Sequence, residues 1–345
     1  MKLHDRRVGD WVEIRSKQEI LSTLDSNGCL EGMPFMPEMT RYCGQRFRVY
    51  KSAHKTCDTV NNTGGRSLAR TVHLEHLRCD GSSHGGCEAG CLLFWNEAWI
   101  KPADPEQPLR SVGTIHGSPC TETTLTGATS YPQSSSSSSR RWRCQATELP
   151  RASAPLQWWH IHQYCSDVTS GNHSLTHMVR IISFALIRNL IRLGVGYRFL
   201  VGSYNFVQRL RRQPAYPDLA GLLPEKSPTP TGILDLQPGE LVRVKSHDEI
   251  RLTISANGMN RGMRFDTEMV KYCGRTFRVQ SRISRILNEK TGEMMTMKSP
   301  CIVLQDVFCR AECTPMRLGC PREVNTYWRE IWLRRVRPDG ITAPD

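Results

Sequence analysis

An internal repeat constrains the fold of this chain more than any other feature of its sequence. Residues 9–49 and 239–279 align without a gap at an offset of 230, and 19 of the 41 positions are identical. An aromatic-Trp-x-Glu-x-Trp pattern then recurs at residues 94–99 and 327–332, at an offset of 233. Such self-similarity indicates that one structural unit occurs twice in the chain.

The repeats divide the 345-residue chain into five segments. In chain order we expect repeat one (1–101), a low-complexity linker (102–172), a basic amphipathic helical segment (173–213), a short linker (214–230) and repeat two (231–345). The first linker contains an unbroken run of serines at 134–139. A run of this kind cannot bury enough apolar surface to become ordered.

Local signals in each repeat predict a small α+β unit made mostly of short strands. An apolar strand at 11–14 precedes a helix over 17–24, with Ser16 and Glu19 as its capping box. A second short helix ends at Gly44, and a β-hairpin follows it. The same signals recur 230 residues later. The predicted fold class is α+β, with two homologous β-rich repeats that resemble SH3-like barrels, joined by a partly disordered and partly helical basic region.

Fourteen cysteines are the second constraint on this chain. The opening residues contain no apolar run like that of a secretory signal peptide, so a disulfide framework is the poorer explanation. Comparison of the repeats places Cys79 with Cys309 and Cys87 with Cys320. Cys301 aligns with position 71. In a hairpin over 47–79, position 71 would lie opposite Cys57, so both cysteines would share one neighbourhood.

Four thiolates at one place fit a tetrahedral zinc centre. The predicted ligand sets are Cys57, Cys79, Cys87 and Cys91 in repeat one, with His84 as an alternative member, and Cys301, Cys309, Cys313 and Cys320 in repeat two. Each set would hold one structural zinc ion, which gives two ions per chain. Buried reduced thiols, disulfides and an iron–sulfur or redox centre stay open as alternatives.

Motifs of the common enzyme classes are absent from the sequence. The chain contains no G-x-S-x-G elbow, Walker loop or H-E-x-x-H pair. Glu38 and Glu268 occupy equivalent positions in the two repeats, and we expect a helix-capping or surface role for both. The sequence therefore identifies no catalytic residue, and enzyme activity stays undecided.

The segment 173–213 contains seven arginines and no acidic residue. Residues 178–193 within it have helical length, with a sector of arginines beside a broad apolar face. Such a helix can pack against its own repeats, contact an anionic membrane surface, or bind nucleic acid or an acidic protein. No stretch approaches the roughly 20 apolar residues that a membrane-spanning helix requires.

Three blocks of sequence carry a resemblance to a known family. They are PFMPEMTRYCGQRFRV, HLEHLRCDGSSHGGCEAGCLLFW and YWREIWLRRV. They resemble uncharacterised bacterial proteins with the same tandem cysteine-containing repeat and no assigned function. The resemblance covers both repeats and the middle helix. It implies a bacterial cytoplasmic setting, and therefore metal binding in preference to disulfides.

These observations favour a non-enzymatic tandem module, stabilised by metal, that binds a protein partner or assembles a complex. The net charge of +13 and the small-barrel pattern make a nucleic-acid-binding protein the first alternative. A metal-dependent accessory enzyme is the second, and an open coordination position would favour it. We expect a cytoplasmic protein, with the helix at 178–193 as a route to peripheral contact with an anionic membrane.

Overall fold

The chain forms two compact units in a computed structural model. The structure describes residues 6–336 except 62, 104–119, 133–139, 195, 211–215, 217–219 and 225–226. Unit 1 comprises the chain up to Arg180 together with Arg285–Thr296 and Met316–Glu323, and unit 2 comprises the rest. Both units combine short helices with antiparallel sheets, so the predicted α+β class is confirmed. The serine run at 134–139 lies outside the described residues.

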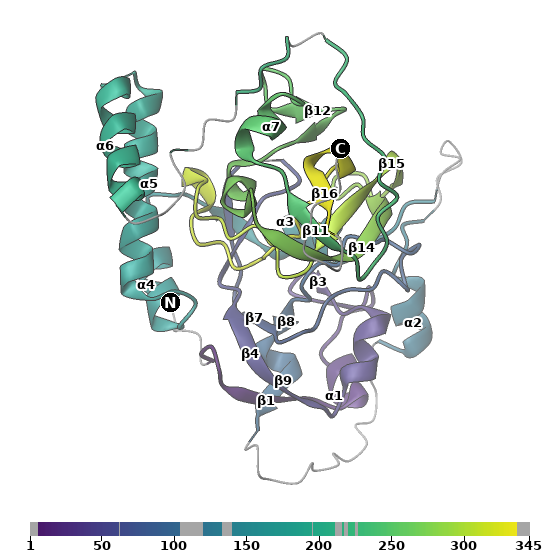
Figure 1. The fold of residues 1–345 in the computed structure, drawn as a ribbon. Helices are drawn as coiled ribbons and strands as arrows, with labels where there is room; N and C mark the ends of the chain where they lie inside the picture. The colour runs from purple at the N-terminus through teal and green to yellow at the C-terminus, as the bar shows by residue number, and fades with distance from the viewer. Residues whose placement is uncertain are drawn as a thin grey trace. The chain divides into compact units, whose positions relative to one another are not determined.

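Unit 1 is built on a five-stranded antiparallel sheet in the order β8–β7–β4–β1–β9 (Figure 1). Its strands are β1 (Trp11–Ile14), β4 (Arg46–Ser52), β7 (Thr71–Leu74), β8 (Trp95–Asn96) and β9 (Ile100–Pro102). Strand β1 pairs on both sides, with Val12 opposite Phe47 of β4 and Pro102 of the edge strand β9. Val12 and Ile14 are fully buried, as alternation along a half-covered strand requires.

A second, three-stranded sheet in unit 1 corrects one sequence-based expectation. It consists of β5 (Lys55–Cys57), β6 (Gly65–Ser67) and β10 (Ala154–Leu156). Cys57 therefore lies opposite Gly65, whereas Thr71 lies opposite Asn96 in the larger sheet. The expectation that positions 57 and 71 lie opposite each other on the two strands of one hairpin was wrong. Strands of three residues are too short to reveal a periodicity, so the extra hairpin had no sequence signal.

The helices of unit 1 are short, and the first follows its predicted capping pattern. They are α1 (Lys17–Leu21), η1 (Pro37–Tyr42), η2 (Glu97–Trp99), α2 (Glu122–Gly127), α3 (Gln145–Ala152) and α4 (His162–Thr169), and a small hairpin of β2 (Cys29–Leu30) and β3 (Met33–Pro34) precedes η1. The Glu19 backbone N–H donates to Ser16 Oγ at 3.3 Å, and the Ser16 N–H donates to the Glu19 carboxylate at 2.9 Å. This reciprocal pair is the predicted capping box.

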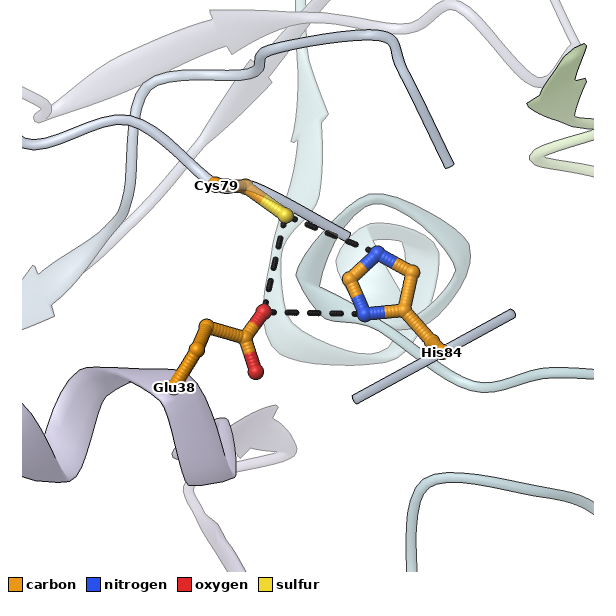
Figure 2. Close-up of side chains that lie close together, drawn as sticks. All are labelled: Glu38, Cys79 and His84. Atoms are coloured by element: carbon orange, nitrogen blue, oxygen red, sulfur yellow. Dashed lines mark hydrogen bonds and ion pairs between the residues drawn. The ribbon is translucent and has the colours of Figure 1, made fainter. Parts of the chain in front are cut away.

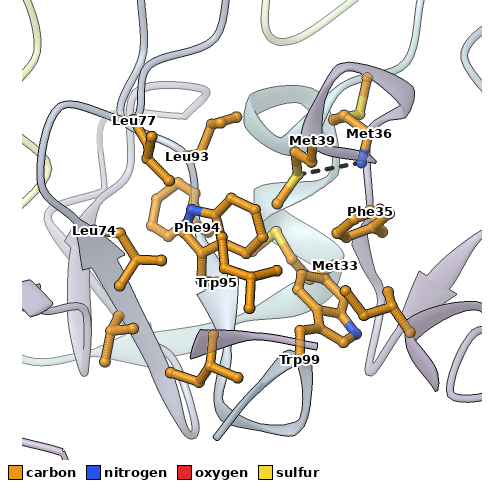
Figure 3. Packing of buried hydrophobic residues seen from close by; sticks show 14 of the residues in the cluster. Met33, Phe35, Met36, Met39, Leu74, Leu77, Leu93, Phe94, Trp95 and Trp99 are labelled. Atoms are coloured by element: carbon orange, nitrogen blue, oxygen red, sulfur yellow. Dashed lines mark hydrogen bonds between the residues drawn. The ribbon is translucent and has the colours of Figure 1, made fainter. Parts of the chain in front are cut away.

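Tryptophans of the recurring Trp-x-Glu-x-Trp pattern form the centre of the unit 1 core (Figure 3). Trp95 and Trp99 have no exposed surface. The Phe35 ring meets both edge-on, with ring centroids 6.1 and 5.2 Å away. Trp99 Nε1 donates to Thr23 Oγ1 at 3.1 Å, so its polar atom is satisfied inside the core.

The range 102–172, which we expected to be a linker, contributes to this core where the structure describes it. Leu149 of α3 is buried in the unit 1 cluster. The buried Gln145 amide donates to the carbonyls of Pro34 and Phe94 at 3.1 and 2.9 Å, and its oxygen accepts from the Phe94 N–H. A few apolar residues are enough for α3 to pack, because most of the core comes from repeat one. The composition of this range therefore resembled that of a linker.

Unit 2 repeats the central arrangement of unit 1. Its elements are β11 (Leu241–Val244), α7 (His247–Arg251), β12 (Met259–Asn260), β13 (Met263–Arg264), η3 (Thr267–Tyr272), β14 (Thr276–Leu287), β15 (Met294–Leu304), η5 (Glu330–Trp332) and β16 (Leu333–Arg335). The short helix η4 (Pro315–Arg317) begins at the last residue of a unit 2 segment and continues into the unit 1 segment Met316–Glu323. The sheet order is β15–β14–β11–β16, and the tip of the β14–β15 hairpin belongs to unit 1. Val242 lies opposite Phe277 and Arg335, the same register that Val12 has in unit 1.

The aromatic core recurs with the strand register. Phe265 meets Trp328 and Trp332 edge-on, with ring centroids 6.2 and 5.4 Å away. Trp332 Nε1 donates to Thr253 Oγ1 at 3.0 Å, as Trp99 does to Thr23 in unit 1. The sequence repeat therefore corresponds to a repeated order of elements, a repeated register and a repeated aromatic cluster.

The basic segment 173–213 contains two helices where a single helical stretch was expected. Helix α5 (Leu175–Arg192) and helix α6 (Tyr197–Leu210) lie side by side (Figure 1). Phe184 of α5 contacts Tyr204 of α6, with ring centroids 5.6 Å apart. None of the helices in the described part of the chain has the length and apolar character needed to cross a membrane.

Candidate metal centre

Three side chains of metal-ligating type converge in unit 1, from η1 and from the loop that follows β7 (Figure 2). Cys79 Sγ lies 3.5 Å from Glu38 Oε1 and 3.5 Å from His84 Nε2. His84 Nδ1 lies 3.6 Å from the same Glu38 oxygen. Among the residues that the structure describes, this is the only group with three such ligand atoms within 4.8 Å of one another.

The backbone of the loop places His84 beside Cys79. The Cys79 N–H donates to the Cys91 carbonyl at 2.8 Å, which fixes the start of the loop. The N–H groups of His84 and Gly86 both donate to the carbonyl of Gly81. Gly81 has φ +72°, and a Cβ there would lie 2.1 Å from the Cys87 carbonyl oxygen. Only glycine permits a turn this tight, so the turn brings the imidazole back over the thiol.

Burial sets the protonation of the ligand atoms in the absence of an ion. Burial raises the pKa of the Cys79 thiol, and the nearby Glu38 charge raises it further. Burial also lowers the pKa of His84, although Glu38 opposes that shift. The pair is therefore a neutral thiol and a neutral imidazole. A metal ion that binds Cys79 as a thiolate must displace the proton of the thiol. The affinity for the metal will therefore decrease as the pH is lowered.

One buried nitrogen in the group lacks a hydrogen-bond partner. His84 Nδ1 has none, although the residue is almost completely buried. The second carboxylate oxygen of Glu38 is satisfied, because the Ser83 hydroxyl donates to it. Buried polar atoms are normally paired, and an ion coordinated between the imidazole and the carboxylate would remove this exception. This nitrogen is thus available to a metal ion.

A cavity of about 40 Å³ lies beside the group. It is lined by Cys79 and His84, and by three further thiols, Cys87, Cys91 and Cys144. A space of this size holds one water molecule or one ion. Cysteine sulfur, histidine nitrogen and a carboxylate oxygen are all zinc ligands, and a fourth ligand could come from water or from one of the lining thiols.

The structure gathers the first predicted ligand set only in part. Cys79 belongs to the candidate centre, and so does His84, the alternative member of the set. Cys87 and Cys91 line the adjoining cavity. Cys57 lies on β5, outside both. Across the described residues, no three members of either predicted set place their sulfurs within 4.8 Å of one another.

The second predicted set is divided between the units. Cys320 belongs to unit 1, and the other three cysteines belong to unit 2. Cys301 Sγ donates to Met297 Sδ at 3.2 Å. The backbone N–H groups of Cys309 and Cys313 are held by the Val324 carbonyl and by the Glu268 carboxylate.

Cys57 and Cys320 form a separate buried thiol pair within unit 1. A hydrogen bond from Cys320 lowers the pKa of Cys57, although burial acts in the opposite direction. The charge of Arg322 adds to this lowering. The Arg322 guanidinium donates to Thr59 Oγ1 at 2.6 Å and to Glu289 Oε1 at 2.8 Å. These contacts make the pair part of a buried polar cluster that spacing along the chain could not reveal.

Glu38 is the candidate ligand that sequence reasoning missed. A helix-capping or surface role was expected, yet its carboxylate is buried and lies among the candidate ligands. Glu268 is buried as well, so the surface role was wrong for both positions. A signal was present, because each glutamate stands directly before a methionine and recurs at the fixed offset of 230.

A second polar cluster in unit 1 has the contact order of a catalytic triad. Ser52 Oγ lies 3.3 Å from His54 Nδ1, and His54 Nε2 lies 3.3 Å from Asp167 Oδ1. The Lys55 ammonium neutralises Asp167 at 2.5 Å. Ser52 has no exposed surface, so no substrate carbonyl can reach it in this conformation. The cluster connects the strand bearing Ser52 to α4.

Comparisons with family models, with curated proteins and with solved structures find no match to this chain. The resemblance to uncharacterised bacterial proteins stays a prediction.

Proposed function

We propose that this protein is a tandem binding module whose first repeat is stabilised by a zinc ion at Glu38, Cys79 and His84. The convergence of these three side chains carries the proposal. An ion there would tie η1, which bears Glu38, to the loop after β7, which bears the other two ligands. Both elements are short, so the ion would add a cross-link to the contacts that Met39 and Leu77 make in the core.

The surroundings of the centre favour a structural ion. The adjoining cavity is small, about 40 Å³, and its lining is mostly apolar. Glu38 and His84 are both buried, so exchange with solvent is restricted. The two β-rich repeats, interpreted as SH3-like units, would then act as a scaffold that binds a protein partner or assembles a complex.

Metal analysis of purified, reduced protein tests the proposal. We expect about one zinc ion per chain for the centre described, and its loss in Glu38→Gln and His84→Ala. Glu268→Gln is the matched control, because it changes the equivalent buried carboxylate of repeat two and should leave the metal content unchanged. Two ions per chain would support the additional cysteine-based site that we predict from the sequence of repeat two.

Retention of a full ion by His84→Ala would overturn the ligand assignment. Cys43→Ser serves as the thiol control, because Cys43 is not among the candidate ligands and should keep its metal. Wild-type protein without bound metal, prepared without chelators and supplied with zinc, would overturn the proposal as a whole.

A metal-dependent enzyme is the second candidate, and one observation favours it. Three protein ligands leave a fourth position, which in catalytic zinc sites is occupied by water. Cobalt substitution distinguishes the two. A fourth ligand from Cys87, Cys91 or Cys144 would add a thiolate-to-cobalt absorption that the corresponding serine variant loses. A water ligand would leave the spectra of all three variants unchanged and would make them sensitive to added small anions.

A further inference from the structure

Helix α5 carries an apolar stripe that the protein leaves uncovered. Leu175, Val179, Leu186 and Leu190 follow a helical spacing of 4, 7 and 4 residues, so they share one face. Their exposed fractions range from 42 to 65%. The opposite face is buried through Ile181 and three further apolar residues, Met178, Phe184 and Ala185. The helix is therefore apolar on two faces, of which only one is used for packing.

Helix α6 has a matching apolar face. Phe199, Phe206 and Leu210 are 77, 64 and 71% exposed, and their spacing of 7 and 4 residues puts them on one side of the helix. A shallow hollow lies between the aromatic rings, lined by Phe199, Phe206 and the small residues Gly202 and Ser203. Exposed leucine and phenylalanine side chains at this density are unusual for a surface that faces only water.

The charge around these faces has a single sign. Arg180 of α5 and Arg198 and Arg209 of α6 are exposed, and residues 173–213 include no Asp or Glu. Two copies of this hairpin would bring two sets of positive charge together, which disfavours self-association through it. An anionic surface complements both properties, because it accepts apolar side chains and attracts the arginines.

We propose that the exposed apolar faces of α5 and α6 dock on an anionic lipid surface. The apolar side chains enter the boundary between headgroups and acyl chains, and the flanking arginines contact lipid phosphates. Neither helix needs to cross the bilayer, in agreement with their length and hydropathy. This inference goes beyond the proposed metal-stabilised module and does not depend on its metal centre.

Vesicle co-sedimentation of the full-length protein tests the inference. The probes are vesicles of phosphatidylcholine alone and vesicles with about one third phosphatidylglycerol. We expect binding to the anionic vesicles, with a smaller fraction bound in high salt because the arginine attraction is screened. Replacing Arg180, Arg198 and Arg209 by Gln should weaken anionic binding by roughly fivefold per residue and reduce its salt dependence.

Apolar insertion is tested by Leu186→Asp with Leu190→Asp, which should reduce vesicle binding at least tenfold. The matched control is Ile233→Asp with Leu252→Asp, because these residues are 86 and 58% exposed and add the same charge away from the hairpin. The control should bind like wild type. All four positions are exposed, so the variants should fold, and circular dichroism verifies this.

Equal recovery of wild-type protein in the supernatant with and without anionic vesicles would overturn the proposal. Equal loss of binding in both double variants would overturn it too, since added negative charge would then explain the effect. The wild-type protein could instead form a dimer that dissociates in the Leu186→Asp with Leu190→Asp variant and not in the control. That result would assign the apolar faces to a second copy of the chain.

Discussion

One buried glutamate occurs in both repeats, and its surroundings differ. Glu38 faces a thiol and an imidazole, with Cys79 Sγ at 3.5 Å and His84 Nδ1 at 3.6 Å. Glu268 lies 3.8 Å from the Lys271 ammonium, and its other oxygen accepts the Cys313 backbone N–H at 2.5 Å. The equivalent carboxylate therefore lies beside a thiol and an imidazole in unit 1, and beside an ammonium and a backbone N–H in unit 2.

The basic residue three positions after each glutamate explains the difference. In unit 1 this residue is Arg41, and it turns to Asp80 at 2.6 Å. In unit 2 it is Lys271, which pairs with Glu312 at 3.1 Å and remains near Glu268. The position equivalent to Asp80 is Arg310, which cannot draw the lysine away. The presence of Arg310 in place of Asp80, together with Glu312 two residues later, thus accompanies a lysine that lies near the carboxylate of Glu268.

This comparison teaches that a duplicated fold does not duplicate a site. The corresponding loop of repeat two, residues 309–320, contains no histidine and so offers no imidazole. Burial raises the pKa of Glu268, and the charge of Lys271 opposes that shift. The described residues of unit 2 accordingly contain no group of three ligand atoms like that of unit 1.

The largest expected effect comes from removing metal. A chelator should destabilise unit 1 by about 4 kcal/mol relative to protein with free zinc about a thousandfold above the Kd, because the ion binds only the folded loop. Unit 2 should change little. Hydrogen exchange monitored by mass spectrometry separates the two, with faster exchange expected around residues 79–91. Uniform deprotection of both units would contradict the asymmetry.

Acidification should distinguish the repeats by a smaller amount. His73 of β7 is fully buried, and its equivalent in repeat two is Val303. Burial lowers the pKa of His73 from 6.5 to about 4, and the charges of Arg78, Arg322 and Lys51 also disfavour its protonation. The Nδ1–H donates to the Leu93 carbonyl, whereas Nε2 has no partner for a second proton.

Because the folded pKa of His73 lies below the unfolded one, its neutral form supports folding fully above about pH 6.5. This support is lost as the pH falls from 6.5 towards 4, by roughly 3 kcal/mol in total. His73→Val should flatten this part of the pH–stability curve measured by denaturant unfolding. A wild-type curve that is already flat between pH 6.5 and 4 would show that the site is open to water.

The smallest effects concern the two equivalent cations. Lys271→Ala should cost about 2 kcal/mol, because it leaves the carboxylate of Glu268 buried with one hydrogen bond and no ammonium. Arg41→Ala should cost less than about 1 kcal/mol, since the Arg41–Asp80 pair is exposed. Thermal unfolding of the two variants measures the difference. Equal costs would mean that the two charge arrangements are equivalent after all.

Sequence reasoning located the repeated framework with good accuracy. The strand at Trp11–Ile14 has its expected bounds, and the Ser16–Glu19 capping box is present. The short helix before Gly44 is the 3-10 helix Pro37–Tyr42. These features depend on neighbouring residues, on turn chemistry and on apolar alternation, which are properties of a local stretch of chain.

Local sequence patterns could not predict the long-range contacts. Cys57 meets Cys320 across 263 positions, and α3 completes a core whose other residues lie about 50 to 110 positions earlier. No local pattern encodes such partners, because the free energy comes from surfaces that meet only after folding. The candidate ligand group was found in part for the same reason. Cys79 and His84 are five residues apart, but Glu38 joins them from another element.

The sequence by itself determined that the chain contains one α+β arrangement twice and that a basic, acid-free helical segment lies between the copies. Self-similarity and periodicity are sufficient for both conclusions. Only the tertiary structure decided which side chains meet, namely that Glu38 joins Cys79 and His84 while Glu268 retains a lysine. The physical reason is that a site depends on the directions of individual side chains and on the charges opposite them. In this chain the repeated framework is the same in both copies, and loops of different sequence determine the directions of the side chains and the charges opposite them.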